Sequence, residues 1–367
     1  MKTTLRDIAR YAQVHHSTVA HVLNGARGNT RVSPETRQRV LQAAAELGYT
    51  ANRAAQQLKT GRSRVVGLLV GPLENPFFAR MVSLCEEALE RRGYDMVLAV
   101  RRDDEVNDLH LLQGLISRQL DGLLLWSETI TQVRERVQQP DMTRTVIMGY
   151  EVPGRDSVAG LMHTGVQAAL EHFVSQGRRR IGYLAPVASL TRRGDPRHDL
   201  YSHAIAELGQ PPRVYSYAGT SFDYAAARAC AEALSQDPDR PDALLCFNDA
   251  AALGTMMGIR RCGLRVPEDI AMIGCDDVPL AAQLDVPLTS IAYPLVDMCA
   301  IAVRMLLERV EEKGMSLQDV PARYISLPTL LHVRESSDCR KIGSSESDRT
   351  LVSRAGSFCS TVPQERT

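Results

Sequence analysis

Three histidines lie close together near the start of the chain, in the stretch DIARYAQVHHSTVAHVLN that runs from Asp7 to Asn24. An imidazole can bind a transition metal, or it can exchange hydrogen bonds with another polar group. A metal site on a helix needs its ligands on one face, at i and i+4 or with a carboxylate partner. His15, His16 and His21 are separated by one and five positions, so no helix face presents all three. We therefore expect neither a metal site nor a cofactor.

The residues around these histidines have the apolar spacing of short helices. The apolar positions are Leu5, Ile8, Ala9 and Ala12, followed by Val19, Val22 and Leu23. A third helix is predicted to begin at Ser33 and Pro34 and to end near Gly48, because these residue types suit an N-cap, a first turn and a C-cap. The polar segment 51–62 is too short to hold a helix alone. We interpret it as a linker that becomes helical on a partner.

Charge is distributed unevenly along a chain whose formal net charge is zero. Residues 1–64 contain eleven Lys and Arg against three Asp and Glu, whereas the other 303 residues contain 32 basic and 40 acidic side chains. A basic segment joined to an acidic body is typical of a polyanion-binding head. A solvated basic surface is the alternative interpretation.

From Arg64 onward, buried-type strands alternate with helices near residues 77–92, 105–119 and 165–176. The strands are predicted at RVVGLLVG, YDMVLAV, DGLLLW, TVIMGY, RIGYLAP, ALLCFN and IAMIGC. This alternation predicts parallel sheets with right-handed crossovers. Two such runs indicate two similar lobes, with a cleft at the carboxyl ends of their strands. The segment LTSIAYP and the helix after it are expected to return to the first lobe.

Targeting signals and metal motifs are missing from the sequence. The 367 residues contain no apolar run long enough to span a membrane and no secretory h-region, so we expect a cytoplasmic protein. The eight cysteines lack metal-type spacing and are expected to be reduced. The tail, residues 337–367, is rich in Ser and Thr and is predicted to be disordered. It contains no leucine heptad, which favours a dimer over a tetramer.

Three long stretches resemble the LacI/GalR repressors. They are TLRDIARYAQVHHSTVAHVLNG, VSPETRQRVLQAAAELGYTANRAAQQLKTG and VVGLLVGPLENPFFARM. The likeness continues through GRRRIGYLAP, ALLCFNDAAALGTMMGIRRCGLRVPEDIAMIGCDD, PLTSIAYPL and LLHVRES, in the order of the family, and covers residues 3–336. The pattern of the head and linker is specific, whereas periplasmic sugar-binding proteins share the architecture of the body.

The resemblance implies a small all-α helix-turn-helix head and a hinge helix, followed by a two-lobed α/β body like a periplasmic binding protein. It assigns the helix-turn-helix to residues 1–50, the hinge to 51–62 and the effector-binding and dimerisation domain to 63–336. The first lobe is expected at about 63–161 and 291–322. The second is expected at about 162–290 and 323–336.

In such a head, the second helix, here about residues 16–23, enters the major groove. His16, Ser17 and His21 match the positions that meet base edges. Thr18, Asn24 and Ser33 match contacts to phosphates, which fix the register of the protein on DNA. His15 takes the place of the usual Ser or Thr cap and is included in the predicted DNA-binding set.

The hinge of the family widens the minor groove when two subunits sit on a palindromic operator. The matching residues here are Leu58, which would wedge between base pairs, and Asn52, Arg53 and Ala55 beside it. An ordinary interdomain linker is the alternative. The chain departs from the family at Gln13, where glycine is usual in the turn, and at Ala51, where proline is usual. The loop before the third helix is also longer. These departures indicate a different operator, with the same mode of binding.

The resemblance also places an effector between the lobes. The matching residues are Asn75, Phe77, Phe78, Arg197, Asn248 and Asp276. Trp126 at the end of a predicted strand can stack on a sugar face, and Phe222 is a further candidate. Aromatic planes beside Arg, Asn and Asp suit a sugar or sugar derivative, although the same set could hold a purine. Alternatively, Trp126 and Phe77 are plain core residues and Asp276 is a loop cap.

The sequence thus predicts a DNA-binding transcriptional regulator, a repressor that binds a pseudo-palindromic operator as a homodimer under control of a small molecule. Gly149 stands where the family usually has Asp, which indicates an altered effector or none. A regulator with a purine or other non-sugar effector is the main alternative, and a cytoplasmic solute-binding protein is another. We expect no enzyme, because the phosphate-binding glycine motifs and the G-x-S-x-G nucleophile motif are missing.

Overall fold

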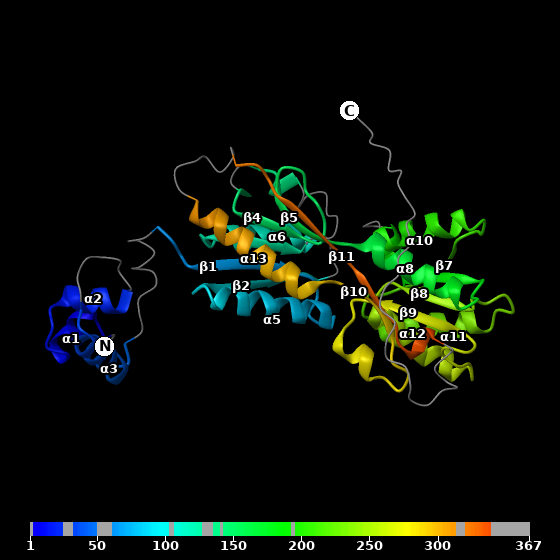
Figure 1. Cartoon of the computed structure of the whole chain (residues 1–367), viewed down its shortest axis with the longest axis horizontal. Coiled ribbons are helices and arrows are strands. Elements are labelled where there is room, and N and C mark those ends of the chain that lie inside the picture. The colour runs from blue at the N-terminus through cyan, green and yellow to red at the C-terminus, as the bar shows by residue number, and fades with distance from the viewer. Residues whose placement is uncertain are drawn as a thin grey trace.

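The computed structural model describes residues 3–24, 32–49, 61–102, 106–126, 135–139, 142–191, 195–312 and 320–338. They form a helical head and an α/β body with two sheets (Figure 1), as predicted. No helix within these described ranges is long and apolar enough to cross a membrane.

The head consists of three helices around a small core. The helices are α1 (Leu5–Tyr11), α2 (His16–Asn24) and α3 (Pro34–Glu46). Each contributes a fully buried aliphatic side chain, namely Ile8, Val19 and Val40. The turn between α1 and α2 places Gln13 at φ 51°, a left-handed conformation that favours glycine. The backbone therefore keeps the family turn without the family glycine.

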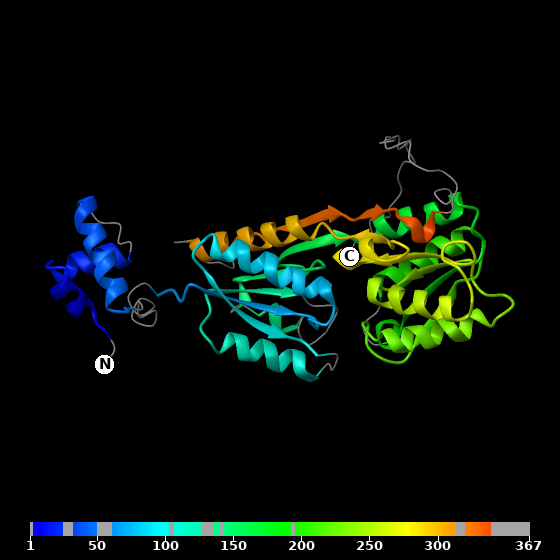
Figure 2. The same ribbon diagram turned by 90° about the horizontal axis from the view of Figure 1, so that it is seen from below.

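The first lobe is built on a six-stranded sheet of order β11-β5-β4-β3-β1-β2. Its strands are β1 (Val65–Val70), β2 (Asp95–Val100), β3 (Gly122–Trp126), β4 (Thr145–Met148), β5 (Asp156–Leu161) and β11 (Tyr324–Pro328). All of its pairs are parallel. Helices α5 (Pro76–Glu90) and α13 (Leu295–Glu311) cover one face, and α6 (Val106–Ile116) covers the other (Figure 2).

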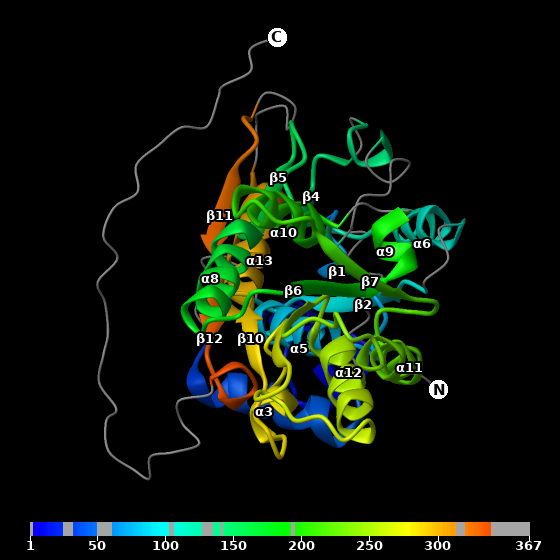
Figure 3. The same cartoon turned by 90° about the vertical axis from the view of Figure 1, so that its right-hand side faces the viewer.

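The second lobe repeats this plan with the sheet order β12-β10-β9-β8-β6-β7. Its strands are β6 (Ile181–Pro186), β7 (Arg213–Tyr217), β8 (Ala243–Cys246), β9 (Ala271–Cys275), β10 (Thr289–Ala292) and the antiparallel β12 (Leu330–His332). Its helices are α8 (Met162–Ser175), α9 (Val187–Thr191), α10 (Pro196–Glu207), α11 (Tyr224–Ser235) and α12 (Asp249–Arg261). Helices α11 and α12 pack on one face of the sheet, and α8 and α10 pack on the other (Figure 3).

The chain crosses between the lobes three times, at β5–α8, β10–α13 and β11–β12. Two predicted boundaries are wrong. Strand β10 belongs to the second sheet, because it pairs with β9, so the return to the first lobe begins only after Ala292. Strand β11 was assigned to the second lobe but pairs with β5 in the first. Its alternating half-exposed pattern is that of an edge strand, which gives little sign of which sheet it joins.

A buried threonine ties two of these crossings together. The Thr329 hydroxyl donates to the Leu161 carbonyl oxygen at 2.8 Å and accepts from the Gly165 amide at 2.9 Å. The Thr329 amide donates to the Thr164 hydroxyl at 3.0 Å. The backbones at these crossings are therefore held side by side.

A buried ion pair fixes the return of the chain to the first lobe. Asp156 begins β5 and accepts two hydrogen bonds from the Arg309 guanidinium of α13, at 2.8 and 2.9 Å. The Arg323 guanidinium donates to the same carboxylate at 2.7 Å. Burial alone would raise the pKa of Asp156, but these donors lower it below its ordinary value.

We predict that Asp156→Asn lowers the free energy of unfolding by about 3 kcal/mol, because it leaves a buried arginine without its carboxylate. Since the folded pKa of Asp156 is lowered, its contribution is present above the unfolded pKa of about 4 and is lost as the pH falls through the folded value. Urea unfolding between pH 3 and 7 should show the largest difference from wild type at neutral pH. Asp285→Asn is the control, because Asp285 pairs with Arg260 on the surface. Equal stability of the two variants at pH 7 would contradict the prediction.

Candidate functional sites in the head and between the lobes

Helix α2 begins with a histidine in place of the usual hydroxyl cap. The Ser17 amide donates to His15 Nδ1 at 3.4 Å, and the Ser17 hydroxyl lies 2.8 Å from the same nitrogen. The His15 carbonyl oxygen accepts from the Thr18 amide at 2.9 Å. The imidazole thus satisfies an amide at the helix N-terminus that would otherwise lack a partner.

The outer face of α2 presents polar side chains at the predicted contact positions. His15, His16 and Ser17 are exposed, and Thr18 and His21 are half-buried. The His15 and His16 rings meet edge to face, with centroids 4.7 Å apart. Val19 and Val22 of the same helix are buried in the head, so the helix turns its polar side outward.

The remaining predicted DNA contacts lie at the start of α3, at the end of α2 and in the predicted hinge. Ser33 caps α3, and its hydroxyl accepts from the Thr36 amide at 3.2 Å. Asn24 is the last residue of α2. Four predicted hinge residues lie outside the described residues, namely Asn52, Arg53, Ala55 and Leu58, and their roles stay predictions.

The lobes enclose a narrow polar pocket of about 50 Å³. Seven of the eight predicted effector residues line it, namely Asn75, Phe77, Phe78, Trp126, Arg197, Asn248 and Asp276. Phe222 is not among the lining residues, because the loop before α11 brings Gly219 and Ser221 to the pocket instead. Most of the residues that line the pocket lie at or just after the carboxyl ends of strands from both sheets. Open α/β folds bind ligands at this edge of the sheet.

A hydrogen bond across the pocket joins the two lobes. Asn75 caps α5, and its side-chain oxygen accepts from the Phe77 amide at 3.0 Å. The Asn75 amide nitrogen donates to Asp276 Oδ2 at 3.2 Å. Asp276 follows β9 and has φ 110°, in the region that favours glycine. We call this contact, between Asn75 and Asp276, the latch.

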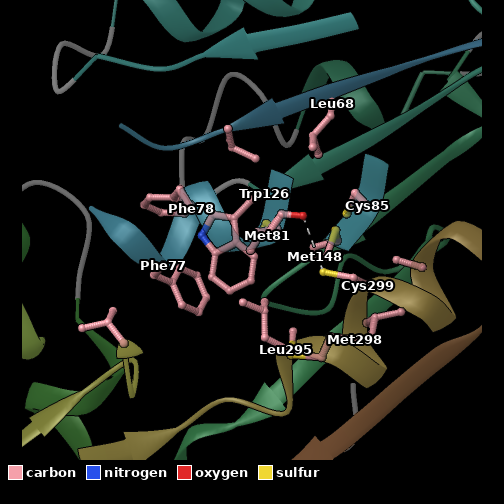
Figure 4. Packing of buried hydrophobic residues seen from close by; sticks show 14 of the residues in the cluster. Leu68, Phe77, Phe78, Met81, Cys85, Trp126, Met148, Leu295, Met298 and Cys299 are labelled. Atoms are coloured by element: carbon pink, nitrogen blue, oxygen red, sulfur yellow. Dashed lines mark hydrogen bonds between the residues drawn. The ribbon is translucent and has the colours of Figure 1, made fainter. Parts of the chain in front are cut away.

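Aromatic side chains form the floor of the pocket. The Phe77 ring lies 5.2 Å from Trp126 and 5.3 Å from Tyr293, between ring centroids. Phe77 and Trp126 are only 4% exposed, so they belong to the core and line the pocket at the same time. Figure 4 shows both beside Phe78, against the interior of the first lobe. Tyr293, which follows β10, also lines the pocket and was not predicted.

Arg197 is held in place before any ligand arrives. Its Nε donates to Asp195 Oδ1 at 2.9 Å and its Nη1 to the Phe247 carbonyl oxygen at 2.9 Å. The guanidinium also lies over the Phe247 ring, 3.8 Å from the centroid. Burial alone would lower the pKa of Arg197, but the Asp195 carboxylate raises it well above its ordinary value. The side chain is therefore a fixed positive charge.

Asn248 supplies a donor without a partner in the described structure. Its side-chain oxygen caps α12 by accepting from the Ala251 amide at 2.8 Å. Its Nδ2 is buried and makes no hydrogen bond, although Asn248 is only 1% exposed and lines the polar pocket. A buried unsatisfied amide costs about 1–3 kcal/mol. The Asn248 Nδ2 group is therefore suited to donate a hydrogen bond to an acceptor atom of a ligand.

A second and larger space adjoins the polar pocket. This wide chamber has a volume of about 560 Å³ and shares Trp126, Ser189, Arg197, Phe247 and Tyr293 with the polar pocket. Its other walls come from the β4–β5 region, the start of α8 and helix α10. Of its lining residues, only Trp126 and Arg197 were predicted from the sequence. Tyr150, two residues after the β4 segment TVIM, was the signal that could have found the chamber.

Two family models match the chain. Residues 4–52 match the lacI family of bacterial regulatory proteins, and residues 170–337 match the periplasmic binding protein-like domain.

Several curated proteins are similar over most of the chain. The HTH-type transcriptional repressor PurR of Aliivibrio salmonicida is 32% identical over 313 residues, which cover 84% of this chain and 93% of that protein. The ribose operon repressor of Haemophilus influenzae is 31% identical over 84% of this chain and 92% of its own length.

Solved structures show the same fold. A lac repressor dimer bound to operator and the anti-inducer ONPF has a TM-score of 0.77 and 26% identity, covering 92% of this chain and 99% of that chain. A complex of the transcriptional regulator CelR with cellobiose has a TM-score of 0.61 and 28% identity, covering 92% of this chain and 100% of that chain.

We predict that Asn75→Ser loosens the latch while keeping the helix cap. Serine caps helices as well as asparagine, but its shorter side chain cannot reach Asp276. Trp126 is the only tryptophan of the chain and reports on the pocket. Its quenching by acrylamide should therefore increase, at nearly unchanged melting temperature.

Asn75→Ala is the comparison variant, because it removes both the cap and the latch and should also lower stability by about 1 kcal/mol. Quenching in Asn75→Ser that equals wild type would show that the latch does not hold the lobes together.

Proposed function

The chain belongs to the LacI family of bacterial transcriptional repressors, and we propose that it binds a pseudo-palindromic operator as a homodimer under control of a small molecule between its lobes. In this proposal, residues 1–50 bind DNA, residues 51–62 form the hinge, and the body binds the effector and dimerises. The protein acts in the cytoplasm and is not an enzyme.

The exposed polar face of α2 carries the proposal. His16 and Ser17 are exposed at the N-terminal turn of a helix whose opposite face is buried in the head. Helices of this kind place their first residues against base edges in the major groove. The eleven basic residues among positions 1–64 supply attraction to phosphate.

The polar pocket supports a hydroxylated effector. The Asn248 amide offers a donor, Arg197 a fixed charge and Asp276 an acceptor. Trp126 and Phe77 offer apolar ring surface beside them. A sugar or sugar derivative matches this mixture of groups. The aromatic floor also suits a purine, whereas a similar protein named as a ribose operon repressor supports the sugar.

The anchoring of the linker to the first lobe supports coupling between the cleft and the head. The Ser63 and Arg64 amides donate to the Asp121 carboxylate at 2.7 and 3.1 Å. The Arg62 guanidinium donates to the Val310 carbonyl oxygen of α13 at 2.7 Å. A rotation of the first lobe is therefore passed to the segment that enters the hinge. An effector shifts DNA affinity by as much as it prefers one lobe arrangement over the other.

Selection of binding sites from random duplex DNA tests the proposed DNA function. The full chain should enrich a two-fold symmetric sequence. His16→Ala and His21→Ala should each weaken binding to it by about 1–3 kcal/mol and relax one position per half-site, because each removes a base contact.

Tyr224→Ala is the control for this experiment, because Tyr224 lies on the surface of the body. Failure to enrich any sequence would contradict the proposed function. Unchanged preferences in both histidine variants would contradict the assignment of base-reading residues.

We further predict that Leu58→Ala weakens binding to the selected operator much more than binding to random DNA. The wedge acts only where two hinges meet in a kinked minor groove. Competition titrations at one fixed salt concentration measure both affinities. An equal loss on the two DNAs would exclude the wedge role.

A further inference from the structure

Two side chains at the start of α2 share a hydrogen bond whose direction can be assigned. His15 Nδ1 lies 2.8 Å from the Ser17 hydroxyl oxygen and 3.4 Å from the Ser17 amide nitrogen. A backbone amide can only donate, and the hydrogen of this one points at Nδ1. Nδ1 therefore carries no proton, because a proton there would face the amide hydrogen.

The hydroxyl of Ser17 must then donate to His15 as well. A neutral imidazole has a single N–H, so the proton of this tautomer lies on Nε2. Since Nδ1 offers only a lone pair, the 2.8 Å contact forms with the Ser17 hydroxyl as the donor. The one hydrogen of that hydroxyl is thereby used, and the lone pairs of Oγ are left to accept a hydrogen bond.

This hydroxyl lies on the side of α2 that is proposed to face DNA. His15 and Ser17 are exposed, whereas Val19 and Val22 of the same helix are buried in the head. Within residues 3–24 and 32–49 of the head, the structure gives Ser17 Oγ no partner besides His15. Its lone pairs are therefore accessible to a molecule that binds this face.

The direction of the bond limits which base edges Ser17 can read. A free serine hydroxyl donates or accepts, so it fits either kind of group in the major groove. A hydroxyl whose hydrogen is held by His15 can only accept. The donors that bases present in the major groove are the exocyclic amines, N6 of adenine and N4 of cytosine. Base acceptors such as N7 and O6 would face the Oγ lone pairs and gain no hydrogen bond.

We infer that His15 is a positioning residue, which holds Ser17 as a hydrogen-bond acceptor for the exocyclic amine of an adenine or a cytosine in the operator. The inference rests on the proposed DNA-binding function. It adds to that function the kind of base group that one position of the head reads, and it gives His15 a part in the choice of operator besides its part as a helix cap.

Base analogues in the selected operator test this inference with the full chain. Ser17→Ala first identifies the base pair whose preference it relaxes. At that pair, purine in place of adenine, or 2-pyrimidinone in place of cytosine, removes the amine, and a 7-deazapurine removes N7. Fluorescence anisotropy at one salt concentration then gives the affinities of wild type and Ser17→Ala for each duplex.

Removal of the amine should weaken wild type about fivefold more than it weakens Ser17→Ala, because only wild type loses a hydrogen bond. Removal of N7 should weaken the two proteins equally. The same analogues at the pair whose preference His21→Ala relaxes are the control, since the two proteins should respond alike there. Coupling of Ser17 to N7, or to no base group, would overturn the inference.

His15→Ser tests whether the histidine sets the choice. Serine caps helices well, so the melting temperature should stay near that of wild type, but the Ser17 hydroxyl is released and can donate. A carbonyl in place of the amine, by adenine to guanine or cytosine to uracil with the partner base matched, should weaken wild type about fivefold and His15→Ser less than about twofold. An equal loss in both proteins would overturn the role of His15.

The tautomer of His15 is measurable without DNA. In the full chain labelled with ¹⁵N in histidine, the ring nitrogen shifts at about pH 8, where an ordinary histidine is neutral, distinguish a bare nitrogen from a protonated one. His15→Ser identifies the His15 signals by their loss. We expect the proton on Nε2. A proton on Nδ1 would overturn the inference for any operator.

The outcomes separate this inference from the proposed function. If the chain selects an operator but Ser17 couples to no amine, the DNA-binding function stands and only the inference is overturned. If the chain selects no operator, the proposed function is overturned, and the inference falls with it whatever the tautomer of His15.

Discussion

The path of the chain between the lobes is the constraint on which the rest of the structure depends. Three crossings join two sheets built to the same plan, and the carboxyl ends of their parallel strands border one cleft. Thr329 binds the backbone of the neighbouring crossing at Leu161 and Gly165. Two of the crossings are therefore held side by side, and a rotation of one lobe against the other would bend the chain at the crossings.

Residues of the cleft combine a structural task with a binding task. Asn75 and Asn248 each cap a helix with the side-chain oxygen, which leaves the amide nitrogen to face the cleft. In Asn75 that nitrogen forms the latch, and in Asn248 it has no partner among the described residues. Capping fixes the rotamer of each side chain. The donors are thus positioned before a ligand binds, which reduces the entropy lost on binding.

The local features of the fold could be predicted from the sequence, whereas its long-range pairings could not. Apolar spacing and cap residues located the helices of the head. Of the seven effector candidates that line the pocket, the end of a buried strand located Trp126, and the family resemblance located the other six. Strand β11 was misassigned because an edge strand with half-exposed side chains fits either sheet. Tyr293 and the wide chamber were missed although Tyr293 and Tyr150 lie within two residues of the ends of β10 and β4.

The family resemblance predicted a role for the hinge that the apolar spacing of the sequence alone does not indicate. The hinge residues 51–62 have too little apolar surface to predict a helix by themselves, and their role in DNA binding is implied by the resemblance to the family. At His15, in contrast, the structure shows an interaction that the resemblance does not predict. The resemblance predicts a hydroxyl cap, and the structure shows how an imidazole fills that position through Ser17.

The central claim is that the state of the cleft controls the head. It is tested most directly by the affinity of wild type and Asn75→Ser for the selected operator, measured at one salt concentration without any effector. Asn75 lies in the first lobe, outside the head, so it has no direct part in DNA recognition. Coupling predicts that loss of the latch changes operator affinity at least threefold. Equal affinity of the two proteins, with the latch shown to be broken, would contradict the account.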